Sequence, residues 1–279
     1  MSLNRRHLHV LGAAAWLSCL GATQAAEPVA AWPTKPLRIV VPYPPGGSSD
    51  IIARAISQPL SEALKQPVIV ENKPGANGNL GADAVAKAAP DGHTLLLCDT
   101  GALAISPSVY SKLAFDPSKD LRGTTMLAYS PHLLAVHPSV KANSLPELVA
   151  LSKQQPINFA VTATGSAPHL AGVAVELATG AKWQYVPYKG GVQAIQDTMA
   201  GHTQVMMNGM LATWPQVQAG KLKVLGVSRK ARMPLIGDVP TIAEQGVAGF
   251  ESGTWQGALV PKGTPDAVVQ RLNTELIKV

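Results

Sequence analysis

Two loops of the sequence combine glycines with hydroxyl side chains directly before a predicted helix, an arrangement that can bind an anion. The first loop is Pro42-Tyr43-Pro44-Pro45-Gly46-Gly47-Ser48-Ser49-Asp50, and the second is Thr162-Ala163-Thr164-Gly165-Ser166-Ala167-Pro168-His169. Glycine lets the backbone approach a ligand closely, and the start of a helix offers unpaired N–H groups at the positive end of the helix dipole. The two loops could therefore hold one anion from opposite sides, mainly through uncharged donors.

Each loop also has a purely structural interpretation. Gly46 and Gly47 could simply form a turn, while Asp50 could cap the helix or pair with Arg54 one turn later. The hydroxyl groups of the second loop could be ordinary helix caps. Spacing alone leaves both interpretations open for each loop.

Three other loops carry candidate groups. Gly75-Ala76-Asn77-Gly78-Asn79-Leu80-Gly81 opens a predicted helix, but its glycine spacing differs from the dinucleotide-binding fingerprint. Asp99-Thr100-Gly101-Ala102 follows a predicted strand, and Tyr188-Lys189-Gly190-Gly191 offers a cation that could equally be solvated.

Motifs of the common enzyme and metal sites are missing from the sequence. It has no G-x-S-x-G elbow, no G-x4-G-K-[ST] loop and no H-E-x-x-H helix. The histidines outside the first 25 residues lack the clustering of metal ligands; they are His93, His132, His137, His169 and His202. We therefore expect neither an enzyme nor a bound metal or cofactor.

Composition narrows the class of partner. The net charge is +6, but the Lys and Arg residues are scattered, and only 5% of residues are aromatic. Neither a phosphate-binding stripe nor a base-stacking platform is present, so we expect no nucleic acid partner. A mildly positive field favours anionic ligands.

Residues 1–25 have the pattern of a cleaved secretory signal. Arg5 and Arg6 precede an apolar stretch, residues 8–20, and small residues follow around Ala25. A buried N-terminal helix and a twin-arginine signal are the alternatives. Cys19 lies inside this segment, which leaves Cys98 without a disulfide partner, and we expect Cys98 to be a small buried hydrophobe. No later segment has an uninterrupted apolar run long enough to cross a membrane. The sequence therefore predicts export of a soluble protein.

Short apolar runs alternate with amphipathic stretches along the remaining chain, a pattern typical of parallel α/β sheets. Strands are predicted at residues 37–41, 68–70, 94–97, 133–136, 157–161, 184–186, 205–207, 222–227 and 255–260, and helices at 49–64, 80–88, 145–154, 170–177, 192–199, 211–218 and from about 265 onward. Ser144-Leu145-Pro146-Glu147 is a capping box for the third of these helices. Ligands bind at the carboxyl ends of such strands, where the candidate loops lie.

Eight ordered motifs resemble the substrate-binding receptors of tripartite tricarboxylate transporters, the Bug-type periplasmic proteins. The motifs run from Trp32 to the C-terminus: Trp32-Pro33-x-Lys35-Pro36, the first anion-binding loop, Gly78-Asn79-Leu80-Gly81 with Ala89-Pro90-Asp91-Gly92, Val186-Pro187-Tyr188-Lys189-Gly190, Ala219-Gly220-Lys221-Leu222, Asp238-Val239-Pro240-Thr241 and Pro261-Lys262-Gly263-Thr264-Pro265. The resemblance implies an α/β Venus flytrap whose two lobes are joined by crossing strands. It implies a first lobe from residues 32–127 and 232–279 and a second lobe from residues 128–231.

The resemblance also implies which residues bind the ligand. Residues matching the carboxylate-gripping loops are Gly46, Gly47, Ser48, Asp50, Thr164, Gly165, Ser166 and His169, and residues matching the loops around the ligand's distal end are Asn79, Thr100, Gly101 and Tyr188. We add Tyr43, from the first loop, and Asn208, which stands where similar receptors usually have an acidic residue. That exchange removes a negative charge and should change the preferred ligand.

We therefore expect a monomeric periplasmic receptor for a small carboxylate, which could be a dicarboxylate, a tricarboxylate, an aromatic acid or an amino acid. Its partners would be the permease subunits of a tripartite transporter, or alternatively a membrane sensor kinase. An exported enzyme with an unrecognised site is the remaining alternative. Similar receptors generally continue beyond the helix that ends here at Val279, so we expect a missing segment that would cover apolar surface on the first lobe.

Overall fold

A computed structural model describes residues 32–279, which leaves the predicted signal sequence, residues 1–25, outside the described residues. Residues 33–279 form one compact unit, and all helices and strands named below belong to it. None of the helices within residues 32–279 combines the length and the apolar composition needed to cross a bilayer.

The first lobe is built on a five-stranded sheet of order β2-β1-β3-β9-β4. Its strands are β1 (Leu37–Val41), β2 (Val68–Asn72), β3 (Thr94–Asp99), β9 (Gly253–Pro261) and β4 (Leu121–Val136). The first three strands are parallel, while β9 lies antiparallel between β3 and β4. The helical elements of this lobe are α1 (Ser48–Leu64), η2 (Ala76–Gly78), α2 (Asn79–Ala86), η3 (Gly101–Ile105), α3 (Ser106–Val109), α4 (Pro117–Asp120) and α9 (Asp266–Lys278).

The second lobe is built on the end of β4 and on four further strands, β5 (Asn158–Val161), β6 (Gln184–Pro187), β7 (Val205–Gly209) and β8 (Lys223–Val227). The parallel strands β5, β6 and β7 alternate with helices along the chain, and β4 runs antiparallel to β7 and β8. The helices are α5 (Leu145–Ser152), α6 (Ala167–Thr179), α7 (Gly191–Met199) and α8 (Met210–Gln218), with a short turn η4 (Pro234–Ile236) after β8.

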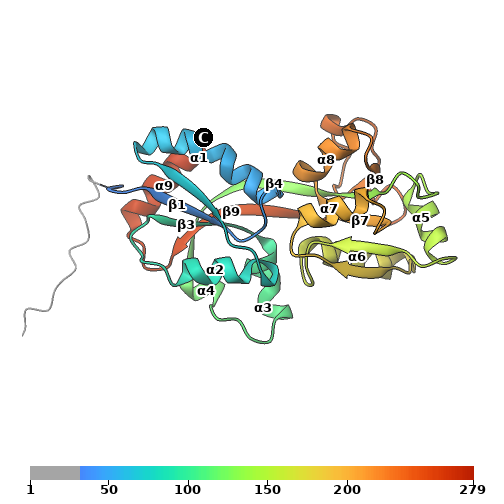
Figure 1. Ribbon diagram of the computed structural model, residues 1–279, viewed down its shortest axis with the longest axis horizontal. Helices are drawn as coiled ribbons and strands as arrows, with labels where there is room; N and C mark the ends of the chain where they lie inside the picture. Colours follow the sequence, from blue (N-terminus) through green and yellow to red (C-terminus); the bar gives the residue numbers. More distant parts are fainter. Residues whose placement is uncertain (1–31) are drawn as a thin grey trace, which may run out of the picture. The chain divides into compact units, whose positions relative to one another are not determined.

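Strand β4 passes from one sheet into the other (Figure 1). Its residues from Leu121 to Pro131 pair with β9, and its residues from His132 to Val136 pair with β7 and β8. The sequence predicted a strand only at residues 133–136, whereas β4 spans Leu121–Val136. It also predicted parallel sheets, whereas both sheets are mixed because β4 and β9 run antiparallel to their neighbours. The register of β4 against β9 shifts twice, near Gly123 and near Met126, and these irregularities remove the regular alternation that marks a strand in sequence.

Each lobe has its own apolar core. In the second lobe, Phe159 packs against Trp183 and Tyr185, with ring centroids 5.2 and 5.6 Å apart. In the first lobe, the core includes Leu96 and Cys98, and the burial of Cys98 confirms its prediction as a small buried hydrophobe. These cores fix the two sheets, and therefore the loops at the strand ends.

The predicted capping box is confirmed at the start of α5. The Ser144 hydroxyl accepts a hydrogen bond of 3.3 Å from the amide of Glu147. The Glu147 carboxylate accepts from the amide of Asn143, one residue before the cap. Both bonds satisfy amides that would otherwise lack partners at the helix start.

Candidate ligand-binding cleft

The loop after β1 is shaped by Asp50, which lies in the first turn of α1 and is almost fully buried. Its carboxylate accepts from the amide of Gly46 at 2.8 Å, from Arg54 Nε at 3.0 Å and from Asn72 Nδ2 at 2.8 Å. These three bonds lower the pKa of Asp50 although its burial opposes them. Gly46 has a φ of +83°, a left-handed conformation that favours glycine. Asp50 therefore holds the turn and does not itself line the cavity.

The first turn of α1 offers its amides to the cleft. No side chain caps this helix at Gly47, and the first amide bonded to the Gly47 carbonyl belongs to Ile51. Gly47, Ser48 and Ser49 line the cavity. Unpaired amides at the positive end of a 17-residue helix favour an anion at this position.

The loop after β5 reaches the cavity from the second lobe. Ser166 is the N-cap of α6 and accepts from the amide of His169 at 3.3 Å. Gly165 has a φ of +76° and donates its own amide to His169 Nδ1 at 3.0 Å. Burial lowers the pKa of His169, so the ring is neutral at neutral pH and serves as an acceptor that fixes the loop. Thr162 Oγ1 is buried without a hydrogen-bond partner, and Thr162 lines the cavity.

The floor of the cavity comes from β3 and β9. Asp99 ends β3, and its Oδ1 accepts from the Tyr43 hydroxyl at 2.5 Å and from the amide of Gly101 at 2.8 Å. Burial raises the pKa of Asp99 to about 6, although the Tyr43 hydroxyl and the amides of Gly101 and Ala102 oppose the rise. Asp99 is partly exposed and is one of the residues that line the cavity.

A buried histidine supports the floor where β4 crosses between the sheets. His132 Nε2 lies 2.8 Å from Thr254 Oγ1, and His132 Nδ1 lies 3.0 Å from Ser252 Oγ. Burial lowers the pKa of His132 to about 3, so this ring is neutral at physiological pH. His132 therefore links β4 to β9 and holds Thr254, a cavity residue, by hydrogen bonding.

The third wall comes from the end of β7 and the start of α7. Asn208 Nδ2 donates to the carbonyl of Gly191 at 3.1 Å, and Asn208 Oδ1 accepts from the amide of Gly209 at 2.8 Å. All three residues line the cavity. Because both ends of its amide are engaged, Asn208 braces this wall without adding charge.

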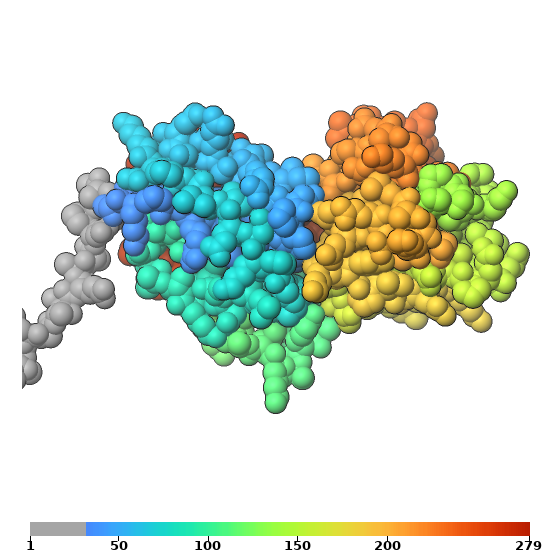
Figure 2. Space-filling model, viewed as in Figure 1, coloured from blue at the N-terminus to red at the C-terminus, as the bar shows by residue number. Residues whose placement is uncertain are grey.

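The two lobes touch around the cavity. Asn77 Nδ2, from η2 of the first lobe, donates to the carbonyl of Gly165 in the second lobe at 3.2 Å. A Cβ on Gly190 would lie only 2.5 Å from Cδ of Pro44, so these two loops are packed against each other. In Figure 2 the blue and cyan surface of the first lobe meets the yellow surface of the second. The space left between the lobes is about 50 Å3, comparable to a few water molecules.

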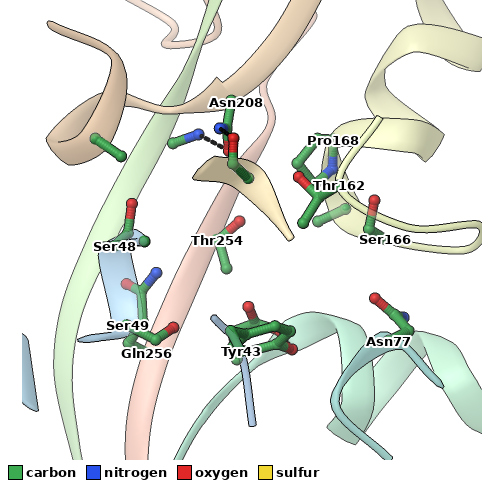
Figure 3. Close-up of a pocket in the computed structure, with 16 residues that line it drawn as sticks. Tyr43, Ser48, Ser49, Asn77, Thr162, Ser166, Pro168, Asn208, Thr254 and Gln256 are labelled. Carbon is green, nitrogen blue, oxygen red and sulfur yellow. Dashed lines mark hydrogen bonds between the residues drawn. The ribbon is translucent and has the colours of Figure 1, made fainter. Parts of the chain in front are cut away.

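Polar but mostly uncharged groups surround this space (Figure 3). Its lining residues are Tyr43, Gly47, Ser48, Ser49, Asn77, Asp99, Thr162, Ser166, Ala167, Pro168, Gly191, Asn208, Gly209, Ala212, Thr254 and Gln256. Among these described residues none is Lys, Arg or His, so amides and hydroxyls would have to hold an anion. Residues 32–279 contain no group of His, Cys, Asp or Glu side chains that could hold a metal ion.

The structure brings some of the residues predicted from the sequence to the cavity and leaves others outside it. Those that line it are Tyr43, Gly47, Ser48, Ser166 and Asn208. Gly46, Asp50, Gly101, Gly165 and His169 shape its loops through the contacts described above. The Thr164 carbonyl accepts from the Tyr110 hydroxyl, and Thr100 Oγ1 accepts from the amide of Trp255. Tyr188 donates to Asp197 outside the cavity, and Asn79 is buried without side-chain partners and does not line the cavity.

Sequence reasoning missed several lining residues. Ser49, Asn77, Asp99, Thr162, Ala167, Pro168 and Gly191 lie within the loops that had been identified as candidates, but their roles had not been assigned. Gly209, Ala212, Thr254 and Gln256 lie outside those loops. Thr254 and Gln256 occupy alternate positions of β9, so they point to the same face of the sheet. Two polar residues at period two in an otherwise apolar strand were the available signal.

Comparison with known proteins is consistent with this architecture. The family model described as "Tripartite tricarboxylate transporter family receptor" matches residues 52–279. Protein BugT of Bordetella pertussis is 36% identical over 256 residues, which cover 90% of this chain and 78% of BugT.

Solved structures resemble the fold over most of the chain. Rpa4515 of R. palustris with adipate has a TM-score of 0.86 and 34% identity, covering 88% of this chain and 83% of that protein. MatC (Rpa3494) from Rhodopseudomonas palustris with bound malate has a TM-score of 0.83 and 31% identity, covering 88% and 85%. The chain therefore has the two-lobed α/β fold that its sequence predicted, with strands crossing between the lobes.

Proposed function

This chain belongs to the tripartite tricarboxylate transporter receptor family, and we propose that it captures a small organic carboxylate between its two lobes and delivers it to the permease subunits of such a transporter. Members of this family are receptors, and a similar solved structure is that of the periplasmic binding protein BugD, so we expect a binding protein and not an enzyme. The structures that carry adipate and malate support a carboxylate as the class of ligand.

The observation that carries this proposal is the convergence of two helix starts on one cavity. The starts of α1 and α6 come from different lobes, and both border the same space. Thr162 lines that space, and its buried Oγ1 has no partner, so a ligand that reached it would supply a hydrogen bond. A carboxylate has two acceptor oxygens, so it could accept from both lobes at once.

Such a ligand would favour the closed arrangement of the lobes. The cavity is small, at about 50 Å3, so we infer that the lobes part at β4 and β9 to admit a ligand and then close around it. A ligand that contacts both lobes binds the closed state more tightly than the open state, and this difference drives closure. The closed surface is then what a membrane partner would recognise.

We propose a periplasmic location for the same reasons. A similar solved structure is that of the periplasmic binding protein BugD, and the sequence of residues 1–25 has the pattern of an export signal. Immunoblotting of periplasmic and cytoplasmic fractions for the full-length chain should find the protein in the periplasm.

A thermal-shift panel of matched acids and amides tests the proposed function. A ligand that binds only the folded protein, at 100 times its dissociation constant, adds about 2.7 kcal/mol of stability. For a protein of this size that corresponds to a rise in Tm of roughly 5 to 11 °C. We expect at least one dicarboxylate, tricarboxylate, aromatic acid or amino acid to give such a rise, and its amide to give none. Equal shifts for acids and amides would contradict carboxylate capture.

A pair of glycine variants assigns the binding to this cleft. Gly47→Val should abolish the shift because its side chain would block approach to the first turn of α1; a Cβ there meets only the Pro44 carbonyl at 3.7 Å, so the fold should persist. Gly123→Val is the matched control, since a Cβ on this exposed β4 residue meets no atom within 4 Å. Unchanged affinity in Gly47→Val would remove this loop from the binding site.

A further inference from the structure

The cavity has an uneven distribution of hydrogen-bonding groups. Its two helix starts present amide donors, whereas its floor presents acceptors. Among the described lining residues, Asp99 and Tyr43 are the titratable ones, and the Tyr43 hydroxyl already donates to Asp99. The floor therefore carries the one carboxyl group that borders the space.

Gln256 lies beside Asp99 on this floor. The two residues are direct cross-strand partners in the antiparallel pair β3 and β9, so their side chains project from the same face of the sheet. Gln256 is 1% exposed, and its Oε1 is buried without a hydrogen-bond partner. A buried amide oxygen without a donor is costly, so a donor from a bound molecule would stabilise it.

Asn77 adds a third acceptor. Its Nδ2 group donates to the carbonyl of Gly165 and to Ser106, which leaves its Oδ1 to accept. A Cβ placed on Gly101 would lie 3.0 Å from Asp99 Oδ1 and 3.2 Å from Asn77 Oδ1, so the two oxygens border the same point. We call Asp99, Gln256 and Asn77 the acceptor corner.

Besides its carboxylate, a ligand carries a second group that would lie at the acceptor corner, and the corner favours some such groups over others. A second carboxylate would bring negative charge towards Asp99 in a poorly solvated space, and like charges there repel. An apolar group would leave Gln256 Oε1 unpaired. An ammonium group has three donors and a positive charge, so it satisfies the amide oxygen and attracts the Asp99 carboxylate.

We propose that the cleft selects acids that also carry a protonated amine, with the carboxylate at the starts of α1 and α6 and the ammonium group at the acceptor corner. Amino acids are the simplest ligands of this kind. The inference rests on the proposed function, because it assumes that the cleft holds a carboxylate. It adds that Asp99 selects, among carboxylates, those that also carry a protonated amine.

Ionisation of Asp99 gives this selection a dependence on pH. The titratable groups that face Asp99 are Tyr43 and Cys98, and burial raises the pKa of both, so they stay neutral below pH 8. With a pKa of about 6, Asp99 is about 10% ionised at pH 5 and almost fully ionised at pH 7.5. Amino acids keep their ammonium charge over this range, so their affinity should rise about tenfold from pH 5 to pH 7.5.

Calorimetric titration of the purified protein with matched pairs tests the proposal. The pairs are L-glutamate with glutarate, L-leucine with 4-methylpentanoate, and L-phenylalanine with 3-phenylpropanoate. We expect at least one amino acid to bind tenfold or more tightly than its partner without the amine. Asp99→Asn should reduce that preference at least tenfold and remove its pH dependence, because the amide keeps an acceptor for Tyr43 but has no charge.

Asp197→Asn is the matched control, since Asp197 accepts from Tyr188 outside the cavity and its loss of charge should leave the preference unchanged. The proposal is overturned if acids without an amine bind the wild-type protein as tightly as their amino acids, or if the preference survives in Asp99→Asn. Binding of dicarboxylates alone would overturn this inference and leave the proposed function standing. Binding of no acid at all would overturn both. Should Asp99→Asn fail to fold, the paired affinities and pH profile of the wild-type protein decide the matter.

Discussion

Asp99 is held between its charged and neutral forms by opposing forces. Burial favours the protonated carboxyl, while hydrogen bonds from Tyr43 and from the amide of Gly101 favour the carboxylate. The result is a group that titrates near neutrality at the wall of the cavity. Stability of the protein must therefore depend on pH through this residue.

The sign of that dependence follows from the raised pKa. The folded state binds the Asp99 proton more tightly than the unfolded state, so the stabilising contribution is complete below about pH 3.8 and is lost as pH rises through about 6. The total change is about 3 kcal/mol, at 1.36 kcal/mol for each pKa unit. Urea unfolding of the wild type and Asp99→Asn between pH 4 and 7 should show the free-energy difference between them shifting by most of this amount, about 2.4 kcal/mol. A constant difference across that range would show that Asp99 has an ordinary pKa.

Single residues also show where sequence reasoning reaches its limit. Gly47, Ser48 and Ser166 could be predicted because they stand directly at helix starts, where the local sequence decides which amides are free. Asp99 and Gln256 could not be paired in advance, because their contact depends on β9 joining β3 from 157 residues further along the chain. The register between β3 and β9 cannot be predicted from the sequence of either strand alone.

Helix starts are the elements that we propose to bind the ligand, and two helices of the second lobe carry comparable caps. Ser144 caps α5, and Ser166 caps α6, each through its hydroxyl oxygen and the amide three residues later. Only Ser166 lines the cavity. The two caps therefore separate stability from ligand binding.

Replacing each cap by alanine should separate the two effects. Ser144→Ala and Ser166→Ala should each lower the free energy of unfolding by about 1 kcal/mol, because a helix loses its N-cap. Ligand affinity should fall in Ser166→Ala alone, since its hydroxyl borders the cavity. Chemical denaturation and calorimetry on both variants measure the two quantities. A loss of affinity in Ser144→Ala would mean that the cap acts on binding through the stability of the lobe.

Most of the longer elements were predictable, and β4 shows why the extent of one long strand was not. Helix α1 was predicted within one residue, and β1 at its full length, since each has one clear hydrophobic period. Strand β4 begins with Leu121-Arg122-Gly123-Thr124-Thr125, which mixes polar and apolar residues and includes a register shift. A strand shared by two sheets has different neighbours along its length, so no single pattern describes it.

The unit formed by residues 33–279 depends on close packing between its lobes. A contact that leaves no room for a side chain is the one between Gly190, at the start of α7, and Pro44, in the loop after β1. Gly190 has a φ of −178°, an extended conformation that any residue can adopt, so only the neighbouring ring limits what fits there.

Gly190→Ala should hold the lobes apart. Its methyl group would lie 2.5 Å from Pro44 Cδ, and relieving that overlap requires the two loops to separate. We expect a larger radius of gyration by small-angle X-ray scattering in the presence of ligand, together with affinity reduced at least tenfold. The melting temperature of the ligand-free protein should change little, because each lobe keeps its own core. A closed, tightly binding variant would contradict the role given to this contact.

The position of β9 has a consequence for the order in which the chain assembles. The strands of the second sheet follow one another within residues 121–227, whereas β9 must insert between β3 and β4 to complete the first. Closing short loops costs less conformational entropy than closing long ones. The second lobe can therefore fold from a contiguous stretch before the first lobe is complete. During synthesis, β1, β2 and β3 would remain a sheet with an open edge until residues 253–261 emerge, and that interval is when the chain is most exposed to mispairing.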